Sequence, residues 1–160
     1  MLKFIGIDLG QKGAIAVQSK LPFTKTTLEI FPFWQRFGGT RLRTATEQEL
    51  LEFIKTSASG AGEVYVTVEH PVYVPSNGKK AIGVLHQNFG FVLGALGALG
   101  LDSLWLPKPV QWKKTTGFKG KDKGQMLQFA QRLFKNSSIT ELTADAVLIS
   151  EACRLHFKDM

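Results

Sequence analysis

Short apolar runs separated by turn residues fill the first third of the chain and predict β-strands. Residues 2–8 form an apolar, β-branched run, residues 10–13 make a glycine-containing turn, and residues 14–18 return as a second strand. Residues 26–33 follow as a third run. Because the connections are short, we expect these strands to form an antiparallel meander. The glycine- and arginine-containing segment of residues 34–43 is interpreted as a basic loop or hairpin.

A helix and the clearest strand of the sequence come next. Residues 46–49, Thr-Glu-Gln-Glu, form a capping box, in which the hydroxyl and the second glutamate satisfy free amides at a helix start. Residues 63–69 alternate in polarity and predict a strand, which Pro71 ends because proline cannot donate to the ladder. This strand ends at Glu69, as the first strand ends at Asp8.

Residues 81–101 contain no acid or base, and this uncharged segment is long enough to span a membrane. The consecutive polar residues 86–88 favour instead a soluble helix buried between protein surfaces. Small and polar residues recur on one face of this helix at helical period, namely Gly83, Gln87, Gly90 and Gly94. Such a stripe allows close approach of another helix, from the same chain or from a second copy.

The last third predicts one short strand and several helices. Residues 103–106 are the strand, and residues 108–134 predict a short helix, a glycine-lysine loop and a second helix. Ser138 and Glu141 fit a capping box for the last helix. Its expected buried face comprises Leu142, Ala146, Ile149 and Cys153.

Taken together, the elements predict one α/β domain over residues 1–160. Alternation of strands and helices in the second half implies right-handed crossovers and parallel pairing. We therefore expect a five-stranded mixed sheet flanked by helices, with an antiparallel meander and the last two strands parallel to the first. With 160 residues, 44% of them hydrophobic, the chain can bury one core of this kind.

Parallel pairing of the strands that end at Asp8 and Glu69 would bring two acids to one sheet edge. Like charges there repel unless a cation lies between them, and Mg²⁺ prefers carboxylate oxygens. Asp145, early in the last helix beside apolar residues, is a candidate third ligand. Other interpretations are a simple turn for Asp8 and an exposed first-turn acid for Asp145. Glu141 could add a fourth carboxylate, although it also fits the cap.

The charge of the chain indicates a polyanionic partner. Lysine and arginine total 20 against 13 acids, a net charge of +7. After residue 108 many lysines lie among glycines, which suits contact with a phosphate backbone without regard to base sequence. The alternative is an ordinary solvated loop. The lysines include Lys113, Lys114, Lys119, Lys121 and Lys123. The single cysteine, Cys153, and the lack of a recognisable secretory leader are typical of an intracellular protein.

Four segments carry a family resemblance: residues 4–10, 66–71, 110–123 and 143–149. In these segments the chain resembles the RuvC-like Holliday junction resolvases of the RNase H-like nuclease superfamily. The resemblance implies an RNase H-like fold and metal-binding catalytic roles for Asp8, Glu69 and Asp145. It also implies that Lys123 lies near the scissile phosphate, with Lys113 as a less secure match. Actin-type ATPases begin similarly but need two such domains.

The resemblance extends to DNA contacts and assembly. The loop containing Tyr73, followed by Lys79 and Lys80, lies where family members insert a side chain at the junction centre. The long helix with Gly83, Gln87, Gly90 and Gly94 would form a homodimer interface. One position departs from the pattern: the family usually has Asp or His three residues before the last Asp, and this chain has Leu142. Either Glu141 replaces that ligand or three acids suffice.

The sequence therefore predicts a structure-selective DNA endonuclease of recombination and repair. We expect it to hydrolyse phosphodiesters at four-way junctions with Mg²⁺, for which Mn²⁺ would substitute, through paired nicks by a homodimer. One alternative is a related nuclease that acts on RNA or RNA–DNA hybrid. Another is a junction-binding protein without catalysis. The sequence does not indicate a motor partner.

Overall fold

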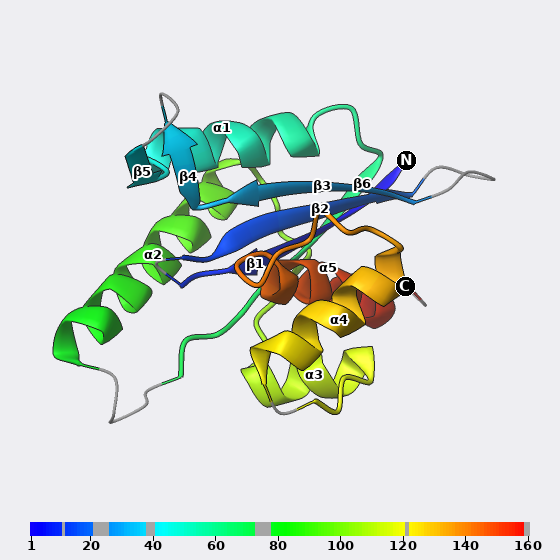
Figure 1. Ribbon diagram of the computed structural model, residues 1–160. Helices are drawn as coiled ribbons and strands as arrows, with labels where there is room; N and C mark the ends of the chain where they lie inside the picture. The colour runs from blue at the N-terminus through cyan, green and yellow to red at the C-terminus, as the bar shows by residue number, and fades with distance from the viewer. Residues whose placement is uncertain (11, 21–25, 38–40, 73–77, 121, 159–160) are drawn as a thin grey trace.

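Five strands form the central sheet of the computed structural model, which describes residues 1–10, 12–20, 26–37, 41–72, 78–120 and 122–158 (Figure 1). Their order across the sheet is β3-β2-β1-β6-β7. The strands are β1 (Leu2–Asp8), β2 (Ala14–Lys20), β3 (Thr27–Pro32), β6 (Glu63–Val68) and β7 (Leu104–Trp105). The segment interpreted as a loop or hairpin is a separate two-stranded hairpin of β4 (Trp34–Phe37) and β5 (Arg41–Thr44).

The strand directions confirm the predicted mixed sheet. β1 pairs antiparallel with β2, and β2 pairs antiparallel with β3, which makes the meander. β6 lies parallel to β1 with Ile7 opposite Val68, and β7 lies parallel to β6. The carboxyl ends of β1 and β6 therefore meet at the same edge of the sheet.

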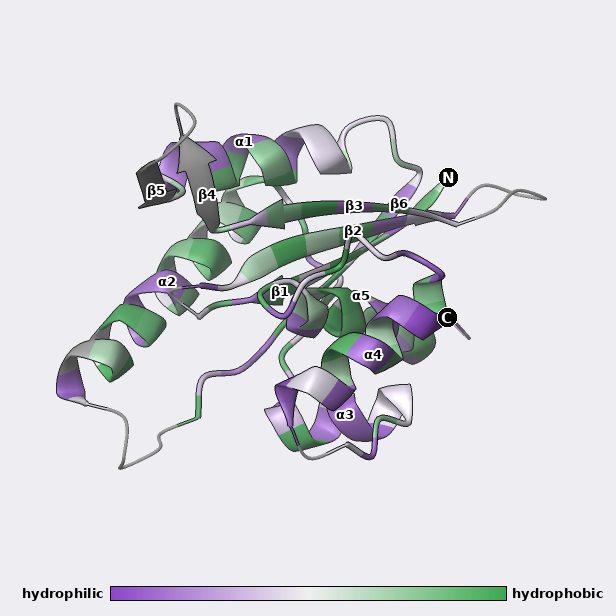
Figure 2. Cartoon of the chain, viewed as in Figure 1, coloured by the Kyte–Doolittle hydropathy of each residue, from purple (hydrophilic) through white to green (hydrophobic). Residues whose placement is uncertain are grey.

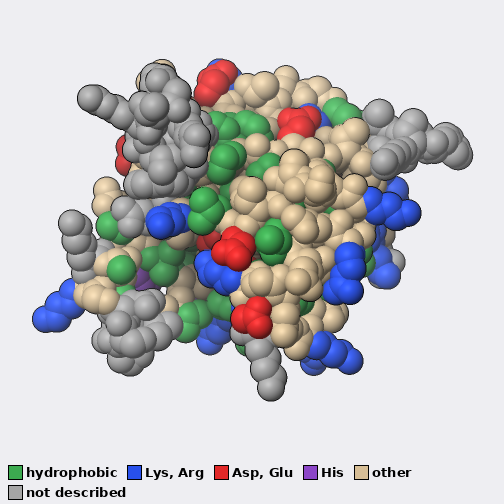
Figure 3. Space-filling model, viewed as in Figure 1, with side chains coloured by type: hydrophobic (Ala, Val, Ile, Leu, Met, Phe, Trp, Pro, Cys, Tyr) green, Lys and Arg blue, Asp and Glu red, His purple; other side chains and the backbone are tan. Residues whose placement is uncertain are grey.

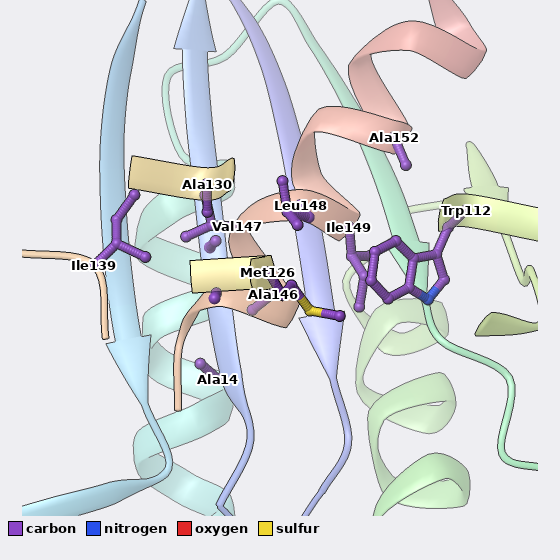
Figure 4. Packing of buried hydrophobic residues seen from close by; sticks show 12 residues of the cluster. Ala14, Trp112, Met126, Ala130, Ile139, Ala146, Val147, Leu148, Ile149 and Ala152 are labelled. Atoms are coloured by element: carbon purple, nitrogen blue, oxygen red, sulfur yellow. The ribbon is translucent and has the colours of Figure 1, made fainter. Parts of the chain in front are cut away.

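Five helices cover the sheet, and they divide between its two faces (Figure 1). They are α1 (Glu47–Ala58), α2 (Lys79–Ala98), α3 (Pro109–Thr116), α4 (Lys123–Phe134) and α5 (Ala144–Phe157). On one face Ile54 of α1 and Val92 of α2 pack against buried residues of β1, β2 and β6. On the other face Trp112, Met126 and Ala146 join a second cluster that belongs to α3, α4 and α5 (Figure 4).

The predicted capping box is present at the start of α1 but not at the start of α5. At α1 the capping box is present, because Glu49 N–H donates to Thr46 Oγ1 and Thr46 N–H donates to Glu49 Oε2. At α5 the predicted Ser138 cap is wrong. The N–H of Ser138 donates to Asn136 Oδ1 at 2.9 Å, and the helix begins six residues later with Thr143 as its N-cap.

The described residues of this chain leave much of the α2 surface uncovered. Gly83, Gly90 and Gly94 are exposed, and a Cβ atom added at any of them would meet nothing within 4 Å. Within the described residues, no helix of the same chain therefore packs on the glycine stripe. Hydrophobic residues nevertheless recur along α2 (Figure 2). By length and composition alone the window Ala81–Ala98 could cross a membrane, with a mean hydropathy of 1.3.

Candidate active site

Two carboxylates meet where β1 and β6 end. Asp8 is the last residue of β1, and Glu69 directly follows β6. The Glu69 N–H donates to the carbonyl oxygen of Ile7 at 3.1 Å, which continues the parallel pairing by one residue. Strand pairing thus fixes the backbone positions of both acids at one edge, as the sequence predicted.

The third acid comes from α5, which lies close against β1. Asp145 occupies the first turn of α5. Gly6 in the middle of β1 makes this approach possible, because a Cβ atom there would overlap the Ser150 nitrogen and lie 2.5 Å from the Ala146 carbonyl oxygen. No other residue type fits without moving the helix. Gly6 is a packing position that the sequence pattern did not single out, although it stands within the matched segment of residues 4–10.

Burial makes ionisation of all three acids unfavourable, and repulsion by neighbouring carboxylates adds to this effect at Asp8 and Glu69. Burial, followed by the charge of Asp145, raises the pKa of Asp8 to about 6, against the opposing effects of the Gly10 N–H and Lys123. Burial raises the pKa of Glu69 to about 7, and the charges of Asp8 and Asp145 add to this effect. Burial also raises the pKa of Asp145. Closely placed, desolvated acids of this kind are typical of functional sites.

Trp112 of α3 holds the Glu69 side chain. The indole Nε1–H donates to Glu69 Oε2 at 2.5 Å, and this hydrogen bond opposes the rise in the pKa of Glu69. Only 1% of the Trp112 surface is exposed, so the ring is fixed by the core of the α3–α5 face. The pattern of residues along the chain does not indicate a role for Trp112. Its only signal was its place in the matched segment, beside Lys113.

Two of the predicted lysines act on the acids. The positive charges of Lys123 and Lys113 lower the pKa of Asp145, and Lys123 also lowers that of Asp8. Lys114, Lys119 and Lys79 are exposed and remain candidates for DNA contact. Tyr73 and Lys121 lie outside the described residues, as does the side chain of Lys80.

Glu141 and Leu142 do not lie in the last helix, as the predicted Ser138 cap would require. Both precede α5, so neither belongs to the helix that carries Asp145. Glu141 is exposed, and the charges that raise the pKa of Asp8 and Glu69 come from within the three acids themselves. The structure thus gives no support for Glu141 as a fourth member of the cluster, and Leu142 leaves that position without a carboxylate.

The donor set suits a hard divalent cation, since carboxylate oxygens are the preferred ligands of Mg²⁺ and Mn²⁺. Burial of three acids without a compensating cation is costly, and a metal ion would remove that cost. In the described part of the chain, however, no three Asp, Glu, His or Cys side chains converge closely enough to hold one ion together. Glu69 is instead engaged by Trp112.

Two solved structures resemble this chain along nearly its whole length. A structure of Thermus thermophilus RuvC aligns with a TM-score of 0.64 and 15% identity, covering 98% of this chain and 96% of that one. T. thermophilus RuvC in complex with a Holliday junction substrate aligns with a TM-score of 0.66, at the same identity and coverage. No protein-family model and no curated protein matches the sequence. The chain therefore has the RNase H-like fold of RuvC, as its four matched segments predicted.

Proposed function

We propose that this protein is a metal-dependent endonuclease that cuts branched DNA at four-way junctions. The observation that carries the proposal is the cluster of Asp8, Glu69 and Asp145 at one edge of a RuvC-type sheet, where burial raises the pKa of each acid. The substrate class is supported by the likeness to a RuvC structure in complex with a Holliday junction. Neither feature alone would specify both the chemistry and the substrate.

In this proposal Asp8, Glu69 and Asp145 would hold Mg²⁺ or Mn²⁺. When bound, such ions supply Lewis acidity, which lowers the pKa of an attacking water and stabilises the leaving 3′ oxygen. The protein contributes placement: the ends of β1 and β6 and the first turn of α5 set the backbone positions of the three acids. To share one ion, their carboxylates would have to converge further than they do in this structure. Trp112 orients Glu69 through its indole N–H. The ammonium group of Lys123 offsets negative charge beside Asp8 and Asp145, where a scissile phosphate would lie.

Basic residues around the acids would hold the DNA backbone. The chain carries a net charge of +7, which favours phosphate contact without reading base sequence. The proposed contacts are Lys113, Lys114, Lys119, Lys121, Lys123, Lys79 and Lys80, with Tyr73 near the junction centre. An intracellular, DNA-associated location follows from this substrate.

We also propose that α2 forms a homodimer interface through Gly83, Gln87, Gly90 and Gly94. All four are exposed, and the helix is apolar along a length that would otherwise face water. A second copy of α2 would cover this surface, and the glycines, which are open on this side and carry no side chain, would let it approach closely. A two-fold dimer would present two identical sites, as paired nicks across a four-way junction require.

A cleavage assay on synthetic DNA tests the proposal directly. Wild-type protein with Mg²⁺ should nick a four-way junction in preference to linear duplex or RNA–DNA hybrid. Asp8→Asn, Glu69→Gln and Asp145→Asn, made one at a time, should abolish nicking yet retain junction binding. Asp102→Asn, an exposed acid in the loop before β7, serves as the charge-matched control. A hybrid-selective wild type would favour the RNA-directed alternative, and tight binding without nicking in either metal would favour a non-catalytic junction binder.

A further inference from the structure

Two hollows adjoin on the outer face of α4. The first has a volume of about 330 Å³ and the second about 490 Å³, and they share Gln128 and Arg132 as walls. The first is also lined by Gly117, Phe118, Lys119, Gly120, Gln125 and Phe129. The second is also lined by Gln131, Lys135, Asn136 and Ser137. Because both hollows border Gln128 and Arg132, they lie next to each other along the helix, and we call them together the α4 groove.

The α4 groove is basic and rich in amides. Lys119, Arg132 and Lys135 line it and are exposed, whereas no Asp or Glu is among its described lining residues. Arg132 Nε donates to the Gln128 carbonyl oxygen of its own helix, and no ion pair with an acid engages these three cations in the described part of the chain. On the face shown in Figure 3, Lys and Arg side chains stand along the lower right, where α4 lies in Figure 1.

Lys135 occupies a backbone conformation that usually selects glycine. It ends α4 with φ 49° and ψ 42°, in the left-handed region, and its N–H donates to the Gln131 carbonyl oxygen. A side chain in this conformation costs about 1 kcal/mol relative to glycine. A lysine here gains some attraction to the helix C-terminus. It also places a cation at the far end of the α4 groove, where glycine would place none.

The α4 groove leads away from the acid cluster. α4 begins at Lys123, whose charge acts on Asp8 and Asp145. From Gln125 to Lys135 the helix spans about 15 Å at 1.5 Å per residue. That length matches about four base-pair steps of a duplex. A backbone held at the acids would therefore continue past Arg132 and Lys135.

The floor of the groove favours phosphate over bases as its occupant. The rings of Phe118 and Phe129 lie 5.6 Å apart and pack against the core cluster of the α3–α5 face. Both rings are therefore only partly exposed, and the cations and side-chain amides in the same lining can donate hydrogen bonds to a ligand. These groups donate hydrogen bonds to phosphate oxygens without discriminating between bases.

We propose that the α4 groove binds the phosphate backbone of the duplex arm that extends beyond the cleavage point, chiefly through Arg132 and Lys135. This inference rests on the proposed function, whose substrate it extends from the junction centre to the arm. The groove adds affinity that does not depend on sequence, and it fixes the direction in which the arm leaves the active site.

The test compares binding of two junctions in EDTA, one with long arms and one with arms cut back to end before the groove. The variant Arg132→Gln/Lys135→Gly removes two charges and relieves the left-handed strain at residue 135, so it should fold at least as well as wild type. The control Lys20→Gln/Lys55→Gln removes two exposed charges that do not line the α4 groove.

We expect the groove variant to bind the long-armed junction about tenfold more weakly than wild type. The slope of the logarithm of its association constant against the logarithm of salt concentration should be smaller in magnitude by about 2. Its affinity for the short-armed junction should equal that of the control. Equal affinities and slopes for the groove variant and the control on long arms would overturn the inference. Binding to linear duplex distinguishes failure of the groove proposal from failure of the proposed function. If wild type shows no junction preference, the proposed function fails, whereas the slope difference on duplex still decides whether the α4 groove binds phosphate.

Discussion

The indole Nε1 of Trp112 and Oε2 of Glu69 lie 2.5 Å apart, which joins α3 to the end of β6 by a single hydrogen bond. The donor is buried in the core, and the acceptor belongs to the candidate metal site. A side chain of the hydrophobic core thus sets the orientation of an acid that the proposed chemistry needs. Loss of such a supporting partner typically lowers metal affinity or activity by about 10- to 100-fold.

Trp112→Phe should keep the packing but remove the donor. Because the hydrogen bond lowers the pKa of Glu69, its loss should raise that pKa and move the pH profile of cleavage to higher pH. We expect the cleavage rate at neutral pH to fall about 10- to 100-fold. Rate measurements between pH 6 and 9 with Mg²⁺ would check this, with Trp105→Phe, a half-buried ring stacked on His156, as the matched control. Identical rates and profiles for both variants would exclude an orienting role for Trp112.

The metal-free protein should lose stability as pH rises from about 4 to 7. The pKa of Asp8 is raised in the folded state from 3.8 to about 6. The stability linked to this group is therefore fully present below the unfolded pKa and declines as pH rises through the folded one. A shift of this size corresponds to about 3 kcal/mol. In EDTA, Asp8→Asn should remove this part of the decline. The Tm of the variant relative to that of wild type should therefore rise between pH 4 and 8.

Calorimetry across that range measures the difference directly. Adding Mg²⁺ to wild type should raise Tm more at pH 8 than at pH 5, since protons and the metal compete for the same carboxylates. A Tm difference between Asp8→Asn and wild type that does not change with pH would contradict the raised pKa of Asp8.

Gly6→Ala should be severely destabilising. The added Cβ atom would meet the backbone of α5 at Ser150, Ala146 and Ile149, where no side chain can rotate away. We expect a loss of at least about 3 kcal/mol in the free energy of unfolding, from forced separation of α5 and β1. Denaturant unfolding measures this loss. Gly83→Ala, where the added Cβ atom meets nothing within 4 Å, is the control and should be neutral or stabilising. A fully stable Gly6→Ala would show that the close approach is not required.

Gly90→Glu/Gly94→Glu should separate the proposed dimer without harming the fold. Both positions are exposed helix residues with open space around the added Cβ atom, and glutamate favours helix more than glycine does. We expect wild type to sediment as a dimer at micromolar concentration and the variant as a folded monomer. Thr56→Glu on the exposed side of α1 controls for added charge. Monomeric wild type would remove the dimer proposal.

The order of the strands and the meeting of two acids at one sheet edge could be predicted from the residue pattern. Hydrophobic runs that end at Asp8 and Glu69, with parallel pairing expected from the strand–helix alternation, sufficed to bring both acids to one edge. These features depend on local periodicity and on general rules of chain connection. These rules did not predict the residue at which α5 begins. Asn136 and Thr143 compete for the same backbone N–H groups as the predicted cap, and the hydrogen bonds they form depend on the folded turn.

The contacts that support the acid cluster could be seen only once the chain was folded. Gly6 permits α5 to lie against β1, and Trp112 reaches Glu69 across 43 residues of sequence. Both relationships join elements that are distant along the chain, so no local pattern encodes them. The α4 groove likewise arises from the packing of the loop at Phe118 against α4. The physical reason is the same in each case: side-chain contacts between elements depend on interhelical and helix–sheet distances, which sequence periodicity does not specify.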